Sequence, residues 1–245
     1  GLRRDPGDTR CNTGLGRLAL KDGRFEQCVA HCDLAIQRLT SRNQHPTDTE
    51  ALYLKGVALC YLGRHEEAYD TLFCAGWNYA HRSAAYYSLA AIDCRFGRWS
   101  PALEKLDVSL GLNAGHARAA NLKAAVLRRL GRDGEALALA RATAAADPLD
   151  LGARFELYFL TGEGLEEIRE IFGGKAENLI DVVCDKLEAG LAEEALRVLD
   201  TADGGYPLLR YYRAWCLHLL GRDGGAELAA AAALETGTCF PSRLE

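Results

Sequence analysis

The stretches Leu62-Gly63-Arg64, Phe96-Gly97-Arg98 and Leu130-Gly131-Arg132 repeat one pattern along this chain of 245 residues. Four residues after each arginine stands an alanine, at Ala68, Ala102 and Ala136. Successive Gly-Arg pairs are 34 residues apart, and a fixed interval of this length indicates stacked copies of one supersecondary unit.

The pattern extends to further units when each is numbered so that the turn glycine is position 15. Position 15 is then occupied by Gly23, Gly63, Gly97, Gly131, Gly190 and Gly221. Position 20 holds Cys28, Ala68, Ala102, Ala136, Ala195 and Ala226, and position 8 holds Gly16, Gly56, Ala90, Ala124, Val183 and Ala214. Small residues at two facing positions let helices approach to about 8–10 Å, so the pattern predicts antiparallel helix pairs.

These spacings resemble the tetratricopeptide repeat (TPR), in which small residues and a closing proline recur at set offsets. The resemblance implies an all-α fold, a right-handed superhelix or solenoid of about seven antiparallel helix pairs in a single domain over residues 1–245. The expected units are residues 9–40, 49–80, 83–114, 117–148, 151–174, 176–203 and 207–236, of which 151–174 is degenerate.

Several longer stretches resemble one bacterial group of proteins. They are Trp77-Asn78-Tyr79, residues 82–86, Asn121-Leu122-Lys123, Leu130-Gly131-Arg132, residues 147–150, Tyr206-Pro207, Phe240-Pro241 and Arg243-Leu244-Glu245. In that group a C-terminal TPR array follows a β-rich domain of unknown function with a carbohydrate-active look. Because the chain has no Met and begins at Gly1, we expect a fragment of a longer protein. The resemblance to this group implies that the missing N-terminal part holds the chemistry.

The composition of the chain indicates which classes of partner it binds and in which cellular compartment it is found. The net charge of −5 and the pI of about 5.8 give no overall attraction to nucleic acid or to an anionic membrane. No apolar run approaches the roughly 20 residues of a membrane helix. Nine cysteines, an odd number without regular short spacings, indicate reduced thiols, so we expect a cytoplasmic protein that binds neither nucleic acid nor membrane.

Cysteines give the strongest candidate for a metal site. Cys28, His31 and Cys32 fall at i, i+3 and i+4 of one predicted helix, a spacing compatible with metal ligands. Cys28 and Cys32 also occupy positions 20 and 24, where a thiol packs as a small hydrophobic group. Since no fourth ligand follows at zinc spacing, packing is the favoured interpretation, and neither a metal nor a Cys60–Cys94 disulfide is expected.

Other clusters give no catalytic arrangement. Glu163, Glu166, Glu167 and Glu170 share one helical face, which is typical of a solvated surface, and no nucleophile accompanies them. Gly221-Arg222-Asp223-Gly224-Gly225 follows no strand, so it is a turn and not a phosphate-binding loop. The sequence therefore predicts a protein that is not an enzyme and has no cofactor.

A candidate ligand groove comes from the first helix of each unit. At 100° per residue, positions 4, 8 and 11 point into the pair, and positions 2, 5, 9, 12 and 13 cluster on the opposite side. In TPR proteins these latter positions line the concave groove. The predicted ligand-binding residues there are Tyr53, Tyr87, Arg95, Arg118, Asn121, Arg128 and Arg129. Because arginine binds carboxylates in bidentate fashion, they favour an acidic peptide, with an ordinary solvated face as the alternative.

The same positions are apolar in the last unit. They hold Leu208, Tyr211, Trp215, His218 and Leu219, a set too apolar for free exposure. We expect a cover from the C-terminal segment through Phe240, from a second copy of the chain, or from the missing N-terminal domain.

The sequence thus predicts a non-catalytic protein–protein interaction scaffold that binds a protein or an acidic peptide in its concave groove. The alternative is an accessory C-terminal domain of a larger carbohydrate-active enzyme, packed on its own N-terminal domain. A third hypothesis, binding of single-stranded RNA, is disfavoured by the acidic net charge.

Overall fold

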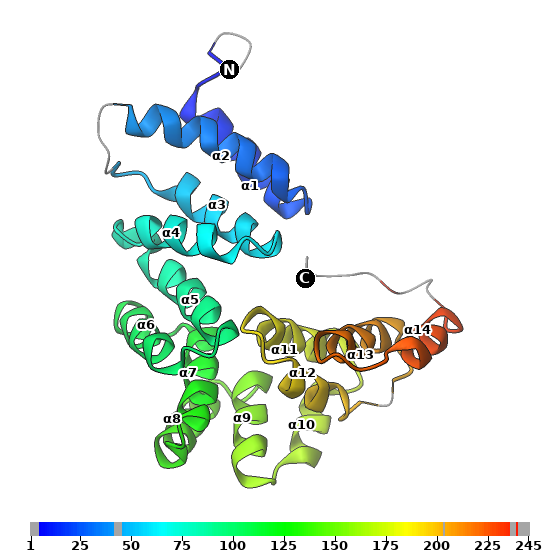
Figure 1. Cartoon of the computed structure of the whole chain (residues 1–245). Coiled ribbons are helices and arrows are strands. Elements are labelled where there is room, and N and C mark those ends of the chain that lie inside the picture. The colour runs from blue at the N-terminus through cyan, green and yellow to red at the C-terminus, as the bar shows by residue number, and fades with distance from the viewer. Residues whose placement is uncertain (1–4, 42–45, 203, 236–238, 240–245) are drawn as a thin grey trace. The chain divides into compact units, whose positions relative to one another are not determined.

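The computed structural model describes residues 5–41, 46–202, 204–235 and 239, and within these ranges all regular secondary structure is helical. The helices form seven consecutive pairs (Figure 1): α1 (Thr9–Lys21) with α2 (Phe25–Thr40), α3 (Glu50–Tyr61) with α4 (His65–Ala75), α5 (Tyr79–Arg95) with α6 (Trp99–Leu112), α7 (Ala117–Arg129) with α8 (Asp133–Ala146), α9 (Leu151–Thr161) with α10 (Leu165–Phe172), α11 (Ala176–Glu188) with α12 (Ala192–Leu199), and α13 (Pro207–Leu219) with α14 (Gly225–Ala232). The predicted all-α fold of paired helices is confirmed.

The turn glycines explain why each pair closes in the same way. At position 15 all six glycines have φ between +69° and +73°, a left-handed conformation that a residue with a Cβ rarely adopts. The next residue then donates its backbone N–H five residues back, as Arg64 does to the carbonyl of Leu59 at 2.9 Å. This is the Schellman geometry that satisfies the last carbonyls of a helix.

Small residues at positions 8 and 20 bring the two helices of a pair together. The position-20 residues of five units are fully buried, and Ala226 of the last unit is exposed. A Cβ at Gly56 would lie 2.5 Å from Cγ of Leu72, and one at Gly16 would lie 2.8 Å from Sγ of Cys32. Any larger side chain at these two glycines would therefore force the paired helices apart.

The chain divides into two compact units. The N-terminal unit runs to Ile92 and includes Asp107–Ala114, and the C-terminal unit holds Asp93–Leu106 and the described residues from Gly115 onward. Helices α5 and α6 thus contribute to both units. The core of the N-terminal unit includes Leu54, Leu59, Leu72 and Leu89. In the C-terminal unit the core gathers Phe155, Ile168, Leu179, Val183 and Leu199.

The degenerate fifth pair has a different turn from the others. Gly162 and Gly164, with φ of +75° and +91°, separate α9 from the short helix α10. Phe155 and Ile168 from the two helices are buried in the same core. Elsewhere, α5 begins at Tyr79, earlier than the period places it, because Oδ1 of Asn78 accepts the N–H of Ala80 at 2.8 Å and caps the added turn.

Candidate interaction surfaces

Four arginines of the predicted groove lie in the C-terminal unit, on α7 and at the end of α5. Helix α7 contains no acidic residue and carries Arg118 in its first turn and Arg128 and Arg129 in its last. Arg95 is the last residue of α5. All four contact groups of later helices of the same chain, which lie beside α7 within this unit (Figure 1).

Arg95 caps the end of α11. Its Nη2 donates to the carbonyl oxygens of Leu187 at 2.6 Å and of Glu188 at 3.1 Å. The last carbonyls of a helix have no partner within the helix, and a cation there interacts favourably with the helix dipole. A Cβ at Gly190 would lie 2.9 Å from Cα of Arg95, so the glycine permits this close approach of the α11–α12 turn.

Arg118 binds two carboxylates on α11. Its Nη2 lies 2.8 Å from Oδ1 of Asp185 and 2.5 Å from Oε2 of Glu188. The side chain of Arg118 is 40% exposed, and those of the two acids are 29% exposed. This contact is therefore partly solvated, and its net contribution to stability is about 1 kcal/mol or less.

A buried ion cluster joins α7, α9, α11 and α12. Glu156, Lys186 and Glu194 are 0%, 6% and 2% exposed. Nζ of Lys186 pairs with Oε1 of Glu156 and lies 3.3 Å from Oε2 of Glu194. Arg128 places Nη2 at 2.9 Å from Glu194 and 3.3 Å from Glu156, and Arg129 reaches Glu194 at 2.8 Å. Two buried carboxylates thus face three cations.

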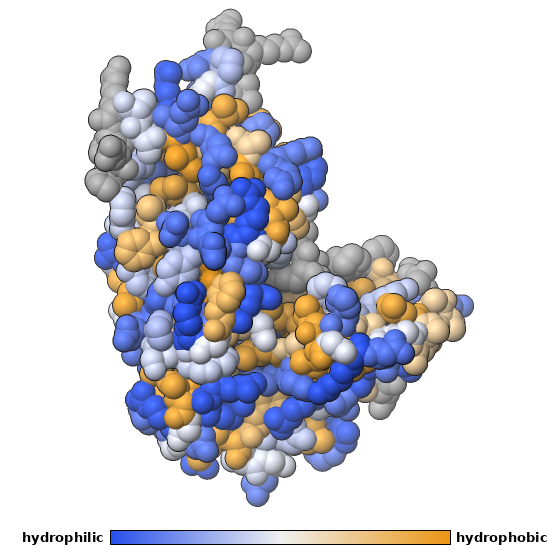
Figure 2. All heavy atoms as spheres, viewed as in Figure 1, coloured by the Kyte–Doolittle hydropathy of each residue, from blue (hydrophilic) through white to orange (hydrophobic). Residues whose placement is uncertain are grey.

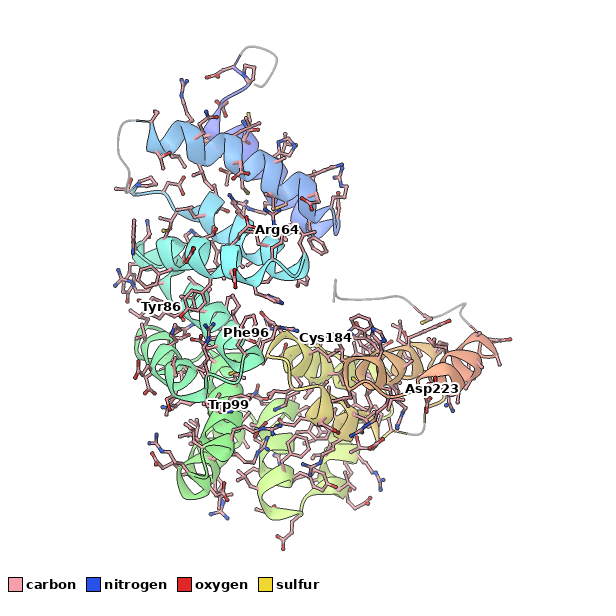
Figure 3. All side chains as sticks on the ribbon, in the orientation of Figure 1. Arg64, Tyr86, Phe96, Trp99, Cys184 and Asp223 are labelled. Carbon is pink, nitrogen blue, oxygen red and sulfur yellow. The ribbon has the colours of Figure 1, made fainter. Side chains whose placement is uncertain are left out.

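Aromatic rings line this cluster. The Phe159 ring lies under three cations, with its centroid 5.3 Å from Cζ of Arg128, 5.6 Å from Nζ of Lys186 and 4.3 Å from Cζ of Arg197. Trp99, labelled at the start of α6 in Figure 3, lies 5.8 Å from Cζ of Arg129. Cations over ring faces are attracted by the ring quadrupole, so the rings stabilise the positive charges that the carboxylates only partly balance.

The electrostatics favour the charged forms of Glu194, Lys186 and Arg128. Burial alone raises the pKa of the Glu194 carboxyl, but the charges of Lys186, Arg128 and Arg129 outweigh it and lower that pKa to about 2. Burial lowers the pKa of Lys186, whereas Glu156 and Glu194 raise it above its ordinary value, and the same two acids raise the pKa of Arg128. Groups held so firmly in their charged forms serve structure and do not exchange protons near neutral pH.

The other three predicted groove residues also contact the chain itself. Nδ2 of Asn121 donates to Oδ1 of Asp150 at 2.9 Å, and Asp150 in turn caps the N-terminus of α9. In the N-terminal unit, Tyr53 stacks on His81 with ring centroids 5.5 Å apart, and Tyr87 is buried at 4% exposure. Arg95, Arg118, Asn121, Arg128 and Arg129 all belong to the C-terminal unit. Binding of a separate acidic ligand by them stays a prediction.

Sequence reasoning missed the acidic and basic residues that these arginines contact. Lys186 falls at position 11, one of the positions that point into the pair, and a charge there signals a buried ionic partner. Asp93 occupies the same position in the third unit, where it is 1% exposed and pairs with Arg98 and Lys105, each at 2.8 Å. Glu156, the acidic residue between Phe155 and Leu157 in α9, gives the same signal.

Positions 2, 5, 9, 12 and 13 of α13 differ from those of α7 in exposure. Tyr211, Trp215 and Leu219 are 40%, 51% and 44% exposed, His218 is exposed and Leu208 is half-buried. Trp215 stacks on His218 with ring centroids 5.3 Å apart. Apolar side chains reach the surface over α13 and α14 in Figure 2. These five side chains are here called the α13 face. Four of them are exposed, whereas Leu208 packs against the core of the C-terminal unit. The cover expected through Phe240 lies outside the described residues.

The cysteines considered as metal ligands are buried in the core, and the glutamates considered as catalytic groups lie on the surface. Cys28 and Cys32 are fully buried, with 4.0 Å between their sulfur atoms. Among the described residues no group of three His, Cys, Asp or Glu side chains could hold a metal ion. The four glutamates of 163–170 are exposed, and two of them pair with Arg154 and Arg169. In the part of the chain that is described, no helix is both long and apolar enough to span a bilayer.

Solved structures of TPR proteins share this fold. A TPR protein from Parabacteroides merdae aligns with a TM-score of 0.56 at 14% identity, over 94% of this chain and 94% of that chain. YrrB, described as a TPR protein with an unusual peptide-binding site, aligns with a TM-score of 0.52 at 17% identity, over 95% and 96% of the two chains. PilW, a type IV pilus biogenesis factor, gives a TM-score of 0.52 at 14% identity over 96% of each chain. No protein-family model matches the sequence. At these identities the likeness concerns the fold.

Proposed function

We propose that this chain, which has the fold of TPR proteins, is a non-catalytic interaction scaffold that binds a peptide segment of a partner protein on the α13 face. The single observation that carries the proposal is the exposure of Tyr211, Trp215 and Leu219 on one side of α13. Contiguous exposed apolar groups on a soluble protein mark interaction sites, and Tyr and Trp are the residue types that anchor interfaces.

Comparison within the chain supports this choice of surface. Positions 2, 12 and 13 of α7 hold arginines that are engaged by α9, α11 and α12, whereas the same positions of α13 hold Leu208, His218 and Leu219. The described residues thus engage the three α7 arginines, whereas His218 and Leu219 of α13 stay exposed. YrrB, which shares the fold, is described as having a peptide-binding site.

The partner segment that fits the α13 face is apolar or amphipathic. An extended or helical peptide can place two or three apolar side chains between Tyr211, Trp215 and Leu219 while its other side stays in solvent. The ring of His218, stacked on Trp215, adds a polar edge that can bond to the peptide backbone.

A peptide library displayed on phage tests the proposal. Peptides selected on the intact chain should be rich in aromatic and aliphatic residues, and Trp215→Ser should weaken their binding at least ten-fold while the melting temperature stays nearly unchanged. Leu228→Ser is the matched control, because Leu228 is also a large apolar residue, 49% exposed, but lies on α14. Peptides that bind Trp215→Ser as tightly as the unaltered chain would contradict the proposal. So would a chain that selects no peptide and instead dimerises through Trp215 in sedimentation velocity.

A further inference from the structure

Helix α1 is a basic helix in an acidic protein. It carries Arg10, Arg17 and Lys21 and no acidic residue, while the chain as a whole has a net charge of −5. All three side chains are exposed. They occupy positions 2, 9 and 13 of the first unit, which at 100° per residue lie within about 40° of one another on the helix. With a rise of 1.5 Å per residue, the first and last are about 16 Å apart.

The C-terminal unit shows what basic residues at these positions bind. Arg118 at position 2 of α7 contacts Asp185 and Glu188, and Arg129 at position 13 contacts Glu194. The acidic groups come from α11 and α12, a helix–turn–helix lying beside α7. The chain therefore contains an internal example of an acidic helical segment held by cations at positions 2 and 13 of a first helix.

In the N-terminal unit the equivalent cations are not all engaged. Arg17 pairs with Glu50 of α3, the acidic residue at position 2 of the neighbouring unit. No ion pair within the described ranges engages Arg10 or Lys21. The acids next in sequence to them are used locally, since Asp8 caps α1 through the N–H of Cys11 and Asp22 pairs with Arg24. Among the described residues, Arg10 and Lys21 thus have no carboxylate held in an ion pair, and both side chains are exposed.

We propose that the α1 face, formed by Arg10, Arg17 and Lys21, binds an acidic helical segment of a partner protein that presents carboxylates about 16 Å apart. The inference rests on the proposed scaffold function but uses a surface in the other compact unit. Its failure is therefore separable from failure of the α13 face.

Fluorescence anisotropy with a labelled model peptide tests the proposal on the intact chain. The probe is an alanine-rich helix with glutamates at i, i+7 and i+11, and the control peptide has the same composition with the glutamates moved to i, i+5 and i+9, which spreads them around the helix. Binding should favour the first peptide at least five-fold. It should also weaken with added salt, because exposed charge pairs are screened over about 8–10 Å at physiological ionic strength.

The second part of the experiment reverses charges on the chain itself. Arg10→Glu with Lys21→Glu should weaken binding of the probe at least ten-fold, while Arg38→Glu with Arg141→Glu, an equal change of net charge at exposed positions on α2 and α8, should change it less than two-fold. If the first variant unfolds by circular dichroism, Arg10→Gln with Lys21→Gln should still lower the affinity at least three-fold. Trp215→Ser should bind the acidic probe normally.

Three outcomes would overturn the inference. One is equal affinity of the probe for the Arg10 and Lys21 variants and for the unaltered chain. The second is equal binding of the two peptides. The third is tighter binding of a single-stranded RNA oligonucleotide than of the probe at the same ionic strength, which would assign the α1 face to phosphates.

Discussion

Arg128 of α7 and Glu194 of α12 form an ion pair with 2.9 Å between Nη2 and Oε2, and the fifth helix pair lies between them in the sequence. Glu194 is 2% exposed and the Arg128 side chain 16%. The contact links the fourth helix pair to the sixth directly. Ordinary repeat arrays are stabilised by contacts between adjacent units, so this link adds a constraint that the period alone does not supply.

Removing the carboxylate of Glu194 should destabilise the C-terminal unit strongly. Glu194→Ala leaves Lys186 and Arg128 with one buried carboxylate, and removal of one partner of a buried pair typically costs about 3–5 kcal/mol. Urea denaturation followed by circular dichroism measures the change. Glu193→Ala is the control, because Glu193 is the neighbouring residue, is 50% exposed and pairs with Arg222 at the surface. Its effect should stay below about 1 kcal/mol. Equal effects of the two substitutions would show that the cluster contributes no more than a surface pair.

The free energy of unfolding should fall in acid because of Glu194. Its pKa is lowered from 4.5 to about 2 in the folded chain, so its contribution is complete above pH 4.5 and is lost as the pH falls towards 2. In that window the unfolded state binds more protons, and one such group gives a slope of up to about 1.4 kcal/mol per pH unit. Glu194→Gln should reduce the slope between pH 4.5 and pH 3. An unchanged slope would mean that Glu194 has an ordinary pKa.

Reversing the charge of Arg128 should unfold the chain where the sequence alone predicts a harmless surface change. Arg128→Glu places a third carboxylate beside Glu156 and Glu194, both of which are buried. An uncompensated buried charge costs several kcal/mol, so the melting temperature should drop by more than about 10 °C. Arg141→Glu, at an exposed position of α8, should shift it by less than about 3 °C. A stable Arg128→Glu variant would show that Arg128 faces solvent and contributes little to the buried cluster.

A methyl group at Gly56 should be destabilising because position 8 has no room for it. The added Cβ would meet Cγ of Leu72 at 2.5 Å, and overpacking of this kind typically costs about 1–3 kcal/mol. Combining Gly56→Ala with Leu72→Ala should lower the free energy of unfolding by less than the sum of the two single losses, because the smaller side chain makes room for the added methyl group. Gly14→Ala on α1 is the control, since nothing lies within 4 Å of a Cβ there, and it should stabilise by about 0.5–1 kcal/mol. Similar effects at both glycines would rule out close helix packing as the reason for Gly56.

The repeat period made the helix pairs predictable because each turn is set by local chemistry. Gly63, Gly97 and Gly131 need a left-handed conformation, and position 20 needs a small side chain, wherever the unit stands in the chain. Each copy of the repeat therefore has glycine or a small residue at the same positions of its sequence. The pair α11–α12 was found in the same way, from Gly190, whereas α9–α10 was expected only as a degenerate unit outside the register.

The partners of the arginines were not predictable from the period. Arg118, Arg129 and Arg95 contact residues 65 to 93 positions later, across a degenerate pair whose geometry the repeat pattern does not specify. The predicted placement of Arg128 in the groove does not tell which later helix contacts it. Lys186 at an inward position and Glu156 in an apolar helix were the available signals, and they indicate burial of charge without naming the partner.

The link between α7 and α12 has a consequence for how the chain opens. A repeat array without long-range links can fray from its end one pair at a time, each pair exchanging its amide protons at its own rate. Here α12 cannot detach without exposing Glu194 and leaving Lys186 and Arg128 short of a counter-charge. Helices α7, α9, α11 and α12 should therefore behave as one foldon, with a common opening free energy in native-state hydrogen exchange, while α13 and α14 open independently at lower cost.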